Sequence, residues 1–406
     1  MAKCRICDAD YSEFISFGDQ PIANGFLKAS EFEDEYFFEL ATGYCSNCHM
    51  VQLIEQPDRE QMFHEQYAFF SSLSEGQKIH FSEFAGELQS TYLQSDDPFA
   101  VEIGSNDGIM LKNLAEAGIR HLGVEPSENV AKVAIENGGN TVSEFFDAAF
   151  AEKIVSEYGQ ADTITSANVI CHIPYMHSVL EGVNILLKPD GVYIYEDPYL
   201  GDIVEKTSYD QIYDEHVFFF SLLSVSAMLE RHDMEVFDVR HLDVHGGSMR
   251  YYIARKGSKS VTENVERLYN KEILLGLNSV DTYDQLRRNI EKSRDDLLSI
   301  LTNIKHEQGR PIIAYGATSK STTVTNYCGI GPDLVEFISD TTPLKQDKFS
   351  PGMHIPVLPY EEFVKAKPKY ALLFAWNHQK EVLAKESEYR DRGGKWLVYV
   401  PEVKFI

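Results

Sequence analysis

The main fold signal of this chain is Val101-Glu102-Ile103-Gly104-Ser105-Asn106-Asp107-Gly108. Its apolar beginning predicts a strand over 99–103, and its two glycines predict a tight turn into a helix near 108–117. Such a turn lets a ligand approach the backbone closely. The other interpretation of Gly104 and Gly108 is a turn with a structural role alone.

Strand and helix patterns continue to alternate beyond this turn. The predicted elements cover 121–124, 127–137, 147–157, 162–167, 175–187 and 191–195. This alternation is typical of a parallel sheet with helices on both faces. Two β-like runs, 235–243 and 248–255, flank His245-Gly246-Gly247 and predict an antiparallel hairpin at one edge of the sheet.

Helices are predicted on both sides of this sheet in the sequence. A helix over 74–94 is expected to bury one face, made of Ile79, Phe81, Phe84, Leu88 and Leu93. One or two connecting helices are expected in 261–308, where charges alternate with Leu268, Ile273, Leu286, Ile290, Leu297, Ile300 and Leu301.

A second series of strands is predicted near 311–315, 334–338, 370–375 and 396–400. The fold class is therefore α/β, with two Rossmann-like sheets behind a small amino-terminal module. The predicted divisions are 1–65, 66–257 and 258–406.

Length and charge restrict the classes of protein that fit. The 406 residues suggest two or three domains at about 150 residues each. A net charge of −26 disfavours a general nucleic-acid scaffold, because phosphates need a positive field. No apolar run approaches the roughly 18–20 residues of a membrane span, and no secretory signal is apparent at the amino terminus. We therefore expect a cytoplasmic protein.

Four of the six cysteines form two CxxC pairs, Cys4-Arg-Ile-Cys7 and Cys45-Ser-Asn-Cys48. Paired knuckles of this kind place four thiolates around Zn²⁺ in a closed, structural site. A redox dithiol is the alternative, but it would normally occur once, at the head of a helix in a βαβ unit. His49 is predicted to be a bystander, since four thiolates already complete the shell.

A cofactor site is predicted at the first turn. Glu125 ends the second strand about 20 residues after Gly104, where a carboxylate accepts hydrogen bonds from a ribose diol. NAD sites share this acid. The carboxylates of Glu102 and Asp107 suit a cationic cofactor better, and Leu187-Lys188-Pro189-Asp190-Gly191 resembles a turn of class I methyltransferases that use S-adenosylmethionine. A solvated strand end is the other interpretation of Glu125.

The predicted reaction centre is Tyr209-Asp210-Gln211-Ile212-Tyr213-Asp214-Glu215-His216, after the fifth strand. Sheet ligands bind outside the carboxyl ends of parallel strands, so this segment should overhang the cofactor. His216 beside Glu215 suits a general base, and we expect the carboxylate to favour the charged imidazole. Alternatively, His216 caps a helix that begins at Val217.

Other side chains are predicted to join this centre. The hydroxyls of Tyr213 and Tyr67 could donate to an oxyanion. His172 follows the fourth strand and either faces the acceptor or is a buried structural residue. His232 and His241 are predicted to be structural or exposed.

The order of these motifs resembles that of the sugar C-methyltransferases, which methylate C-3 of nucleotide-linked 4-keto-deoxysugars. The resemblance spans nearly the whole chain: the CxxC pairs, the Glu-Ile-Gly-Ser-Asn-Asp-Gly turn, Tyr-Asp-Glu-His, His-Gly-Gly-Ser, and Tyr-Gly-Ala with a downstream Lys. It implies zinc at Cys4, Cys7, Cys45 and Cys48. It implies S-adenosylmethionine at Glu102, Gly104, Ser105, Asn106, Asp107, Gly108, Glu125 and Asn168.

The resemblance also implies a reaction. His216 would be the base at C-3, with Tyr213, Glu215, Tyr67 and His172 lining the sugar site, and with substrate contacts from His245, Gly246, Gly247, Ser248 and Lys320. The C-4 ketone makes the C-3 proton removable, and the second Rossmann-like unit would help to hold the nucleotide-sugar. Transfer to oxygen or nitrogen, and a noncatalytic nucleotide-sugar-binding protein, remain alternatives. The sugar, the nucleotide and the oligomeric state stay open.

Two motifs depart from the family pattern. The family commonly has Tyr-His-Glu-His where this chain has Tyr213-Asp214-Glu215-His216, and Lys-Gly-Asn-Thr where it has Lys320-Ser321-Thr322-Thr323. The first departure changes the charge beside the predicted base. The second changes contacts in the carboxy-terminal domain.

Overall fold

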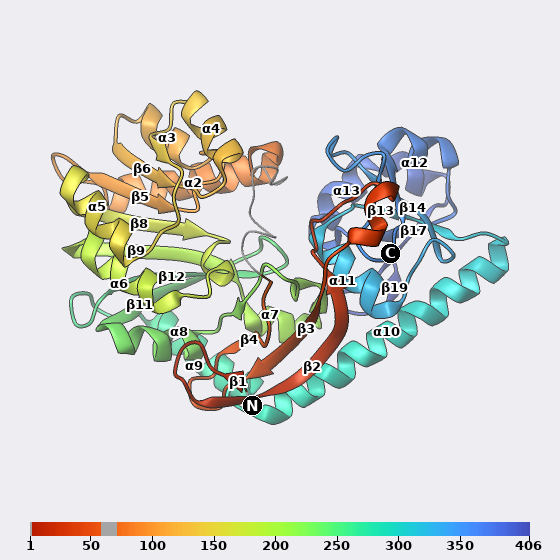
Figure 1. Cartoon of the computed structure of the whole chain (residues 1–406), viewed down its shortest axis with the longest axis horizontal. Helices are drawn as coiled ribbons and strands as arrows, with labels where there is room; N and C mark the ends of the chain where they lie inside the picture. Colours follow the sequence, from red (N-terminus) through yellow and green to blue (C-terminus); the bar gives the residue numbers. More distant parts are fainter. Residues whose placement is uncertain (1, 58–70) are drawn as a thin grey trace.

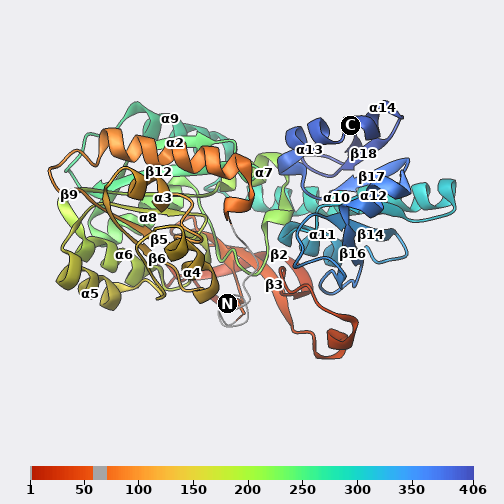
Figure 2. The same cartoon turned by 90° about the horizontal axis from the view of Figure 1, so that it is seen from above.

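The computed structural model describes residues 2–57 and 71–406. Two α/β lobes lie side by side, and an antiparallel sheet and a long helix bridge them on one side (Figure 1). The view from above separates the two lobes in the same way (Figure 2). The predicted fold class is confirmed.

The central lobe is built on a seven-stranded sheet of order β11-β12-β9-β8-β5-β6-β7. Five of its strands are parallel, and the β11–β12 hairpin closes one edge in the antiparallel sense, as predicted. The strands are β5 (Phe99–Ile103), β6 (Arg120–Val124), β7 (Thr141–Val142), β8 (Ala161–Ala167), β9 (Leu187–Pro198), β11 (Met234–Leu242) and β12 (Ser248–Arg255). The helices are α2 (Glu75–Thr91), α3 (Leu111–Glu116), α4 (Glu128–Glu136), α5 (Ala148–Tyr158), α6 (Met176–Leu186), α7 (Leu200–Lys206) and α8 (Leu222–Leu229).

The carboxy-terminal lobe repeats the parallel arrangement. Its sheet has the order β15-β16-β14-β13-β17-β18-β19, with short antiparallel strands at both edges. The strands are β13 (Ile312–Tyr315), β14 (Val335–Asp340), β15 (Lys348–Phe349), β16 (Pro356–Pro359), β17 (Tyr370–Leu373), β18 (Lys395–Val398) and β19 (Lys404–Phe405). The helices are α11 (Ser319–Cys328), α12 (Tyr360–Ala366), α13 (Gln379–Lys385) and α14 (Ser387–Asp391).

The amino-terminal module forms a small antiparallel sheet. Its strands are β1 (Ala2–Lys3), β2 (Asp10–Pro21), β3 (Phe37–Tyr44) and β4 (Val51–Leu53), and β10 (Phe218–Phe219) adds to β4 from the middle of the chain. A helix beginning at Val217 is therefore wrong, because this segment pairs as a strand. The proposed boundary at residue 65 lies outside the described residues, so the predicted divisions stay predictions.

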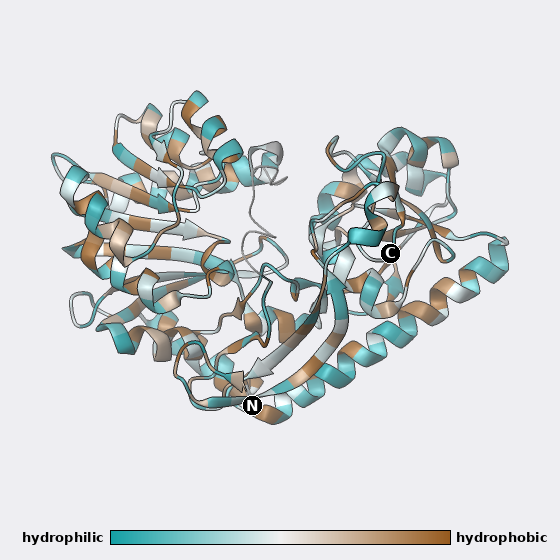
Figure 3. Cartoon of the chain, in the orientation of Figure 1, coloured by the Kyte–Doolittle hydropathy of each residue, from teal (hydrophilic) through white to brown (hydrophobic). Residues whose placement is uncertain are grey.

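Two helices connect the lobes, α9 (Glu263–Leu275) and α10 (Val280–Gln308). Along α10 the hydropathy alternates between apolar and polar (Figure 3). Its buried residues follow at intervals of three and four, as one face of a helix requires: Tyr283, Leu286, Ile290, Ser293, Leu297, Leu301 and Ile304. None of the helices in the described ranges has the length and apolar composition of a membrane span.

Some predicted core positions are wrong. Ile79 is 62% exposed, although the rest of its predicted face is buried. Ile79 precedes Phe81 by two residues, so it lies about 200° round the helix from it. Ile273 is likewise 37% exposed on α9, five residues from buried Leu268.

Candidate functional site

The four amino-terminal cysteines converge on one point. Their sulfur atoms lie within 4.8 Å of one another, and the Sγ atoms of Cys4 and Cys48 and those of Cys7 and Cys45 are 3.5 Å apart. Four ligands at the usual Zn–S distance would be about 3.8 Å apart, so the cluster fits tetrahedral zinc. Gln52 Nε2 donates to the Cys4 sulfur at 3.0 Å, as a donor to a thiolate does.

His49 is not part of the four-cysteine cluster, as expected. Its Nδ1 is 2.8 Å from the Tyr44 hydroxyl, so its ring serves the packing of β3. His232 pairs with His177 at 2.8 Å, and His241 pairs with Asp202 at 2.5 Å, both as structural contacts.

A cavity of about 650 Å³ lies between the two lobes. It is lined by the β5 turn, by the β13 turn, and by Gln211, Tyr213, Glu215 and His216. Of the predicted site residues it brings together Glu102, Gly104, Ser105, Asn106, Glu125, Asn168, His172, Tyr213, Glu215, His216, His245 and Lys320. Tyr67 lies outside the described residues.

Five predicted residues are absent from this lining. Asp107 turns away and accepts the backbone N–H of Ser72 at 3.0 Å, and Gly108 packs against Ala134. The other three hold the hairpin: a side chain on Gly246 would meet Trp376, one on Gly247 would meet Asp202, and Ser248 donates to the Val244 carbonyl oxygen. The structure thus places these five as supports of the site.

The β5 turn is shaped by close packing. Gly104 has φ +69°, and a Cβ there would lie 2.3 Å from Val169, so a larger residue would push the turn out of place. Glu125 ends β6 and accepts the backbone N–H groups of Asn106 at 3.0 Å and Ser127 at 2.9 Å. Each carboxylate oxygen keeps a further lone pair for hydroxyls of a ligand.

Buried carboxyls give this end of the cavity its electrostatic character. Burial raises the pKa of Glu102 well above its usual value, and the charge of Glu125 acts in the same direction. Burial also raises the pKa of Glu125, against the lowering effect of its backbone donors. A cationic ligand would relieve this repulsion, which fits the sulfonium and ammonium groups of S-adenosylmethionine.

His216 has a defined orientation. Its Nδ1 is 2.7 Å from the carbonyl oxygen of Gln211, which can only accept, so Nδ1 carries the proton. Nε2 is therefore the acceptor of the Tyr213 hydroxyl at 2.8 Å. The imidazole presents an unprotonated nitrogen on the cavity side.

Burial lowers the pKa of His216 well below its usual value, and the charges of His172 and Lys320 act in the same direction. Our expectation that Glu215 would favour the charged imidazole is therefore wrong. The carboxylate instead accepts the side-chain amide of Asn24 at 2.7 Å. The imidazole of His216 is thus neutral at neutral pH.

His172 lies against His216, with ring centroids 5.3 Å apart and an interplanar angle of 20°. Burial lowers its pKa to about 4, so it is also neutral. Both imidazoles face the same cavity.

Lys320 brings a cation to this centre from α11. Its Nζ donates to the His245 carbonyl oxygen at 3.1 Å and lies 5.5 Å from the centroid of the Trp376 ring. Burial lowers its pKa to about 8, while the charge of Asp210 acts against this.

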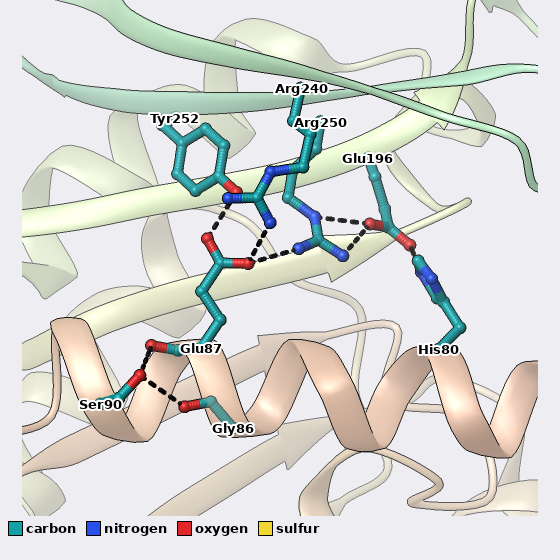
Figure 4. A network of polar contacts seen from close by, with 8 residues as sticks. All are labelled: His80, Gly86, Glu87, Ser90, Glu196, Arg240, Arg250 and Tyr252. Carbon is teal, nitrogen blue, oxygen red and sulfur yellow. Dashed lines mark hydrogen bonds and ion pairs between the residues drawn. The ribbon is translucent and has the colours of Figure 1, made fainter.

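A polar network anchors α2 beside the cavity (Figure 4). Glu196 on β9 accepts Arg250 at 2.7 Å and pairs with His80 at 2.5 Å. Burial acts to raise the pKa of Glu196, but His80 and Arg250 outweigh it and hold the pKa below its usual range. Arg250 also pairs with Glu87 at 3.0 Å, so the helix whose first turn lines the cavity is fixed to β9 and β12.

Sequence reasoning missed part of the lining. Asp340 ends β14 and accepts the backbone N–H groups of Ala317 and Thr342, each at 2.7 Å. Glu125 does the same in the central lobe. Both acids end the second strand of their series, so the position of Asp340 in the sequence was a signal that could have predicted it. Asn24 and Lys345 also line the cavity, and their sequence neighbours give no such signal.

Three family models match successive parts of the chain. Residues 4–63 match a zinc binding domain, 94–239 a methyltransferase domain, and 243–401 the C-methyltransferase C-terminal domain. The chain is 32% identical over 407 residues to the C-methyltransferase NovU of Streptomyces niveus, covering 100% of this chain and 96% of that protein.

Other matches cover only part of the chain. The ubiquinone biosynthesis O-methyltransferase of Methylococcus capsulatus is 33% identical over 96 residues, which cover 23% of this chain and 40% of that protein. A solved S-adenosylmethionine-dependent methyltransferase from Anabaena variabilis has 17% identity and a TM-score of 0.35, covering 43% of this chain and 84% of that one.

The full-length match agrees with the motifs, with the four-cysteine cluster and with the buried acids of the β5 turn. The cofactors are S-adenosylmethionine and Zn²⁺. The chain belongs to the C-methyltransferase family.

Proposed function

We propose that this protein methylates C-3 of a nucleotide-linked 4-keto-deoxysugar, and that His216 removes the C-3 proton. The unprotonated Nε2 of His216 carries this proposal, because the hydrogen bond from Nδ1 to the Gln211 carbonyl oxygen orients the ring in the cavity that the β5 turn also lines. C-methylation of a carbon acid needs such a base.

The first step makes the sugar carbon nucleophilic. The C-3–H bond breaks, its proton passes to Nε2 of His216, and its electron pair forms an enolate with the charge on the C-4 oxygen. The substrate displaces the Tyr213 hydroxyl from Nε2, and this O–H then donates to the enolate oxygen. When bound, S-adenosylmethionine supplies the electrophilic methyl group that the enolate carbon takes, with release of the neutral thioether.

The carboxy-terminal end of the cavity suits a nucleoside diphosphate. Lys320 and Lys345 line it, and the Lys345 ammonium lies 4.9 Å from the Phe26 ring centroid and donates to the Ala317 carbonyl oxygen at 2.8 Å. These two cations provide the local positive charge that an anionic ligand needs on a protein of net charge −26. The Asp340 carboxylate suits hydroxyls of the nucleoside or sugar.

Hydrogen exchange in D₂O tests the proposed reaction. The protein is incubated with a panel of nucleotide-linked 4-keto sugars without the methyl donor, and deuterium at C-3 is measured by mass spectrometry. We expect deuterium to enter at C-3 with at least one sugar. Methyl transfer to oxygen or nitrogen without C-3 exchange, or binding with neither, would contradict C-methylation and support one of the two alternatives.

Replacing Glu125 with alanine should weaken cofactor binding about ten- to hundredfold, the effect of about 1–3 kcal/mol for hydroxyls and amides left without their acceptor. Calorimetry with S-adenosylmethionine and with its demethylated product measures this. Glu128→Ala changes an exposed acid at the start of α4 and is the matched control. An unchanged dissociation constant in Glu125→Ala would contradict the prediction that Glu125 binds the ribose of the cofactor.

The lowered pKa of His216 predicts an unusual pH profile. A base acts when neutral, and a folded pKa well below 6.5 keeps it neutral as the pH falls through 6.5. We therefore expect the C-3 exchange rate to hold through pH 6.5 and to fall only at lower pH. An acidic limb with its midpoint at or above pH 6.5 would contradict this environment for the base.

A further inference from the structure

The zinc module sends an arm, residues 22–36, from β2 and β3 to the other lobe. Figure 1 shows the arm in red against the blue carboxy-terminal lobe. Leu27 and Phe349 exchange backbone hydrogen bonds, Glu35 pairs with His354 at 2.7 Å, and Phe32 stacks on the His354 ring with centroids 3.6 Å apart. The arm is therefore anchored at its far end.

The beginning of the arm reaches the candidate reaction centre. Ala23 N–H donates to the Asp214 carboxylate at 3.0 Å, and Asn24 Nδ2 donates to Glu215 Oε1 at 2.7 Å. Asn24 and Glu215 both line the cavity. Two adjacent residues of the arm thus bind two adjacent residues before His216.

The two departures from the family pattern meet at this same contact. Asp214, in the first departure, accepts from the Ala23 amide, and Thr322, in the second, donates to the Ala23 carbonyl oxygen at 2.9 Å. Thr323 donates to the Ile212 carbonyl oxygen at 2.8 Å. These hydrogen bonds therefore join the arm, the segment 209–216 and α11.

The contact between the arm and the reaction centre pairs hydrogen-bond donors with two buried carboxyls. Asp214 and Glu215 are neighbouring carboxyls with 1% and 4% exposure, and two buried charges side by side repel. Burial and the charge of Glu215 raise the pKa of Asp214 well above its usual value. The Asn24 amide stabilises the charge of Glu215 by hydrogen bonding to it.

We propose that Asn24 is a positioning residue of the reaction centre, and that its side-chain amide holds the Glu215 carboxylate toward the substrate. This role rests on the proposed function and extends it, because the zinc module then contributes to the active site as well as to folding. Asn24 acts through Glu215 and needs no contact with the reacting carbon.

A double-mutant cycle tests this dependence. Asn24→Ala should lower kcat/KM about ten- to hundredfold, the effect of losing a hydrogen bond to a charged group. In a Glu215→Ala background the same change should have no further effect. Glu33→Ala, an exposed position on the same arm, is the control and should retain the parent kinetics. Thermal unfolding and zinc content show that the variants fold.

Asn24→Asp gives a second readout that a structural role would not produce. The Asn24 amide contacts Glu215, whose neighbour in sequence is Asp214 and whose charge also acts on Lys345, and an ionised aspartate in place of the amide would repel Glu215. Between about pH 8 and about pH 5.5 the new carboxyl should gain a proton and donate it to Glu215 as an O–H. The C-3 exchange rate of this variant should therefore rise relative to the parent as pH falls, whereas Asn24→Ala should not recover.

The outcomes separate the two proposals. A parent protein that exchanges C-3 hydrogen, with an Asn24→Ala variant of equal rate or with additive losses in the cycle, overturns the role of Asn24 alone. A parent protein that exchanges no hydrogen with any sugar overturns the proposed function and this role with it. Nonadditive losses in the cycle, together with a C-3 exchange rate of Asn24→Asp that recovers at low pH, support the role of Asn24.

Discussion

Replacing His216 with asparagine should lower turnover by about 10²- to 10⁴-fold, the range of general base catalysis, while both ligands still bind. Asparagine has a similar volume and can still donate to the Gln211 carbonyl oxygen, as Nδ1 of His216 does. It cannot accept the C-3 proton. The loss should therefore appear in kcat and in deuterium exchange at C-3, measured without the methyl donor.

The control for this variant is His306→Asn, which changes an exposed histidine near the end of α10. It should match the parent in every measurement. Calorimetry with S-adenosylmethionine and the nucleotide-sugar checks that His216→Asn still binds both. An exchange rate near that of the parent would mean that the base lies elsewhere, and His172, stacked on His216, would be the next residue to test.

Replacing Cys45 with serine should abolish the stoichiometric zinc and lower the thermal midpoint of the chain, since structural zinc contributes directly to folding free energy. Cys45 is fully buried, and its N–H and C=O close the second knuckle with Met50 and His49. The neighbouring β4 pairs with β10, which follows His216 within three residues. Loss of zinc should therefore reduce activity as well as stability.

Metal analysis and thermal unfolding measure this effect, with Cys328→Ser as the matched control. Cys328 is a buried cysteine on α11 outside the cluster, so its replacement should leave one zinc per chain. A Cys45→Ser variant with unchanged zinc content and unchanged stability would exclude the metal site.

The sequence predicted those parts of the molecule whose structure is determined by residues close together in the chain. The β5 turn, the paired CxxC spacing and the hairpin around His245 each follow from adjacent residues, and all three are confirmed in the structure. Errors arose where spacing was applied loosely, as with Ile79, which faces solvent from the side of α2 opposite Phe81.

What the sequence could not predict is contact between distant residues. Asn24 and Glu215 are 191 positions apart, and Ala23 and Thr322 are 299 apart. No periodicity links such pairs, so the zinc module was predicted only as a folding unit. The pKa of His216 was also missed, because burial and the charges of His172 and Lys320, which are distant in sequence, lower it.

One apolar cluster runs through the amino-terminal sheet, α10 and the carboxy-terminal sheet without interruption, from Phe14 and Tyr44 through Tyr283 and Ile290 to Ile312. The boundaries that separate these segments in sequence are therefore not boundaries of autonomous folding. An excised carboxy-terminal half would expose the apolar face of α10 to water and tend to aggregate. The amino-terminal sheet, α10 and the carboxy-terminal sheet therefore depend on one another for folding. Transferring any one of them into another protein would require new polar residues on the apolar surface that it buries here.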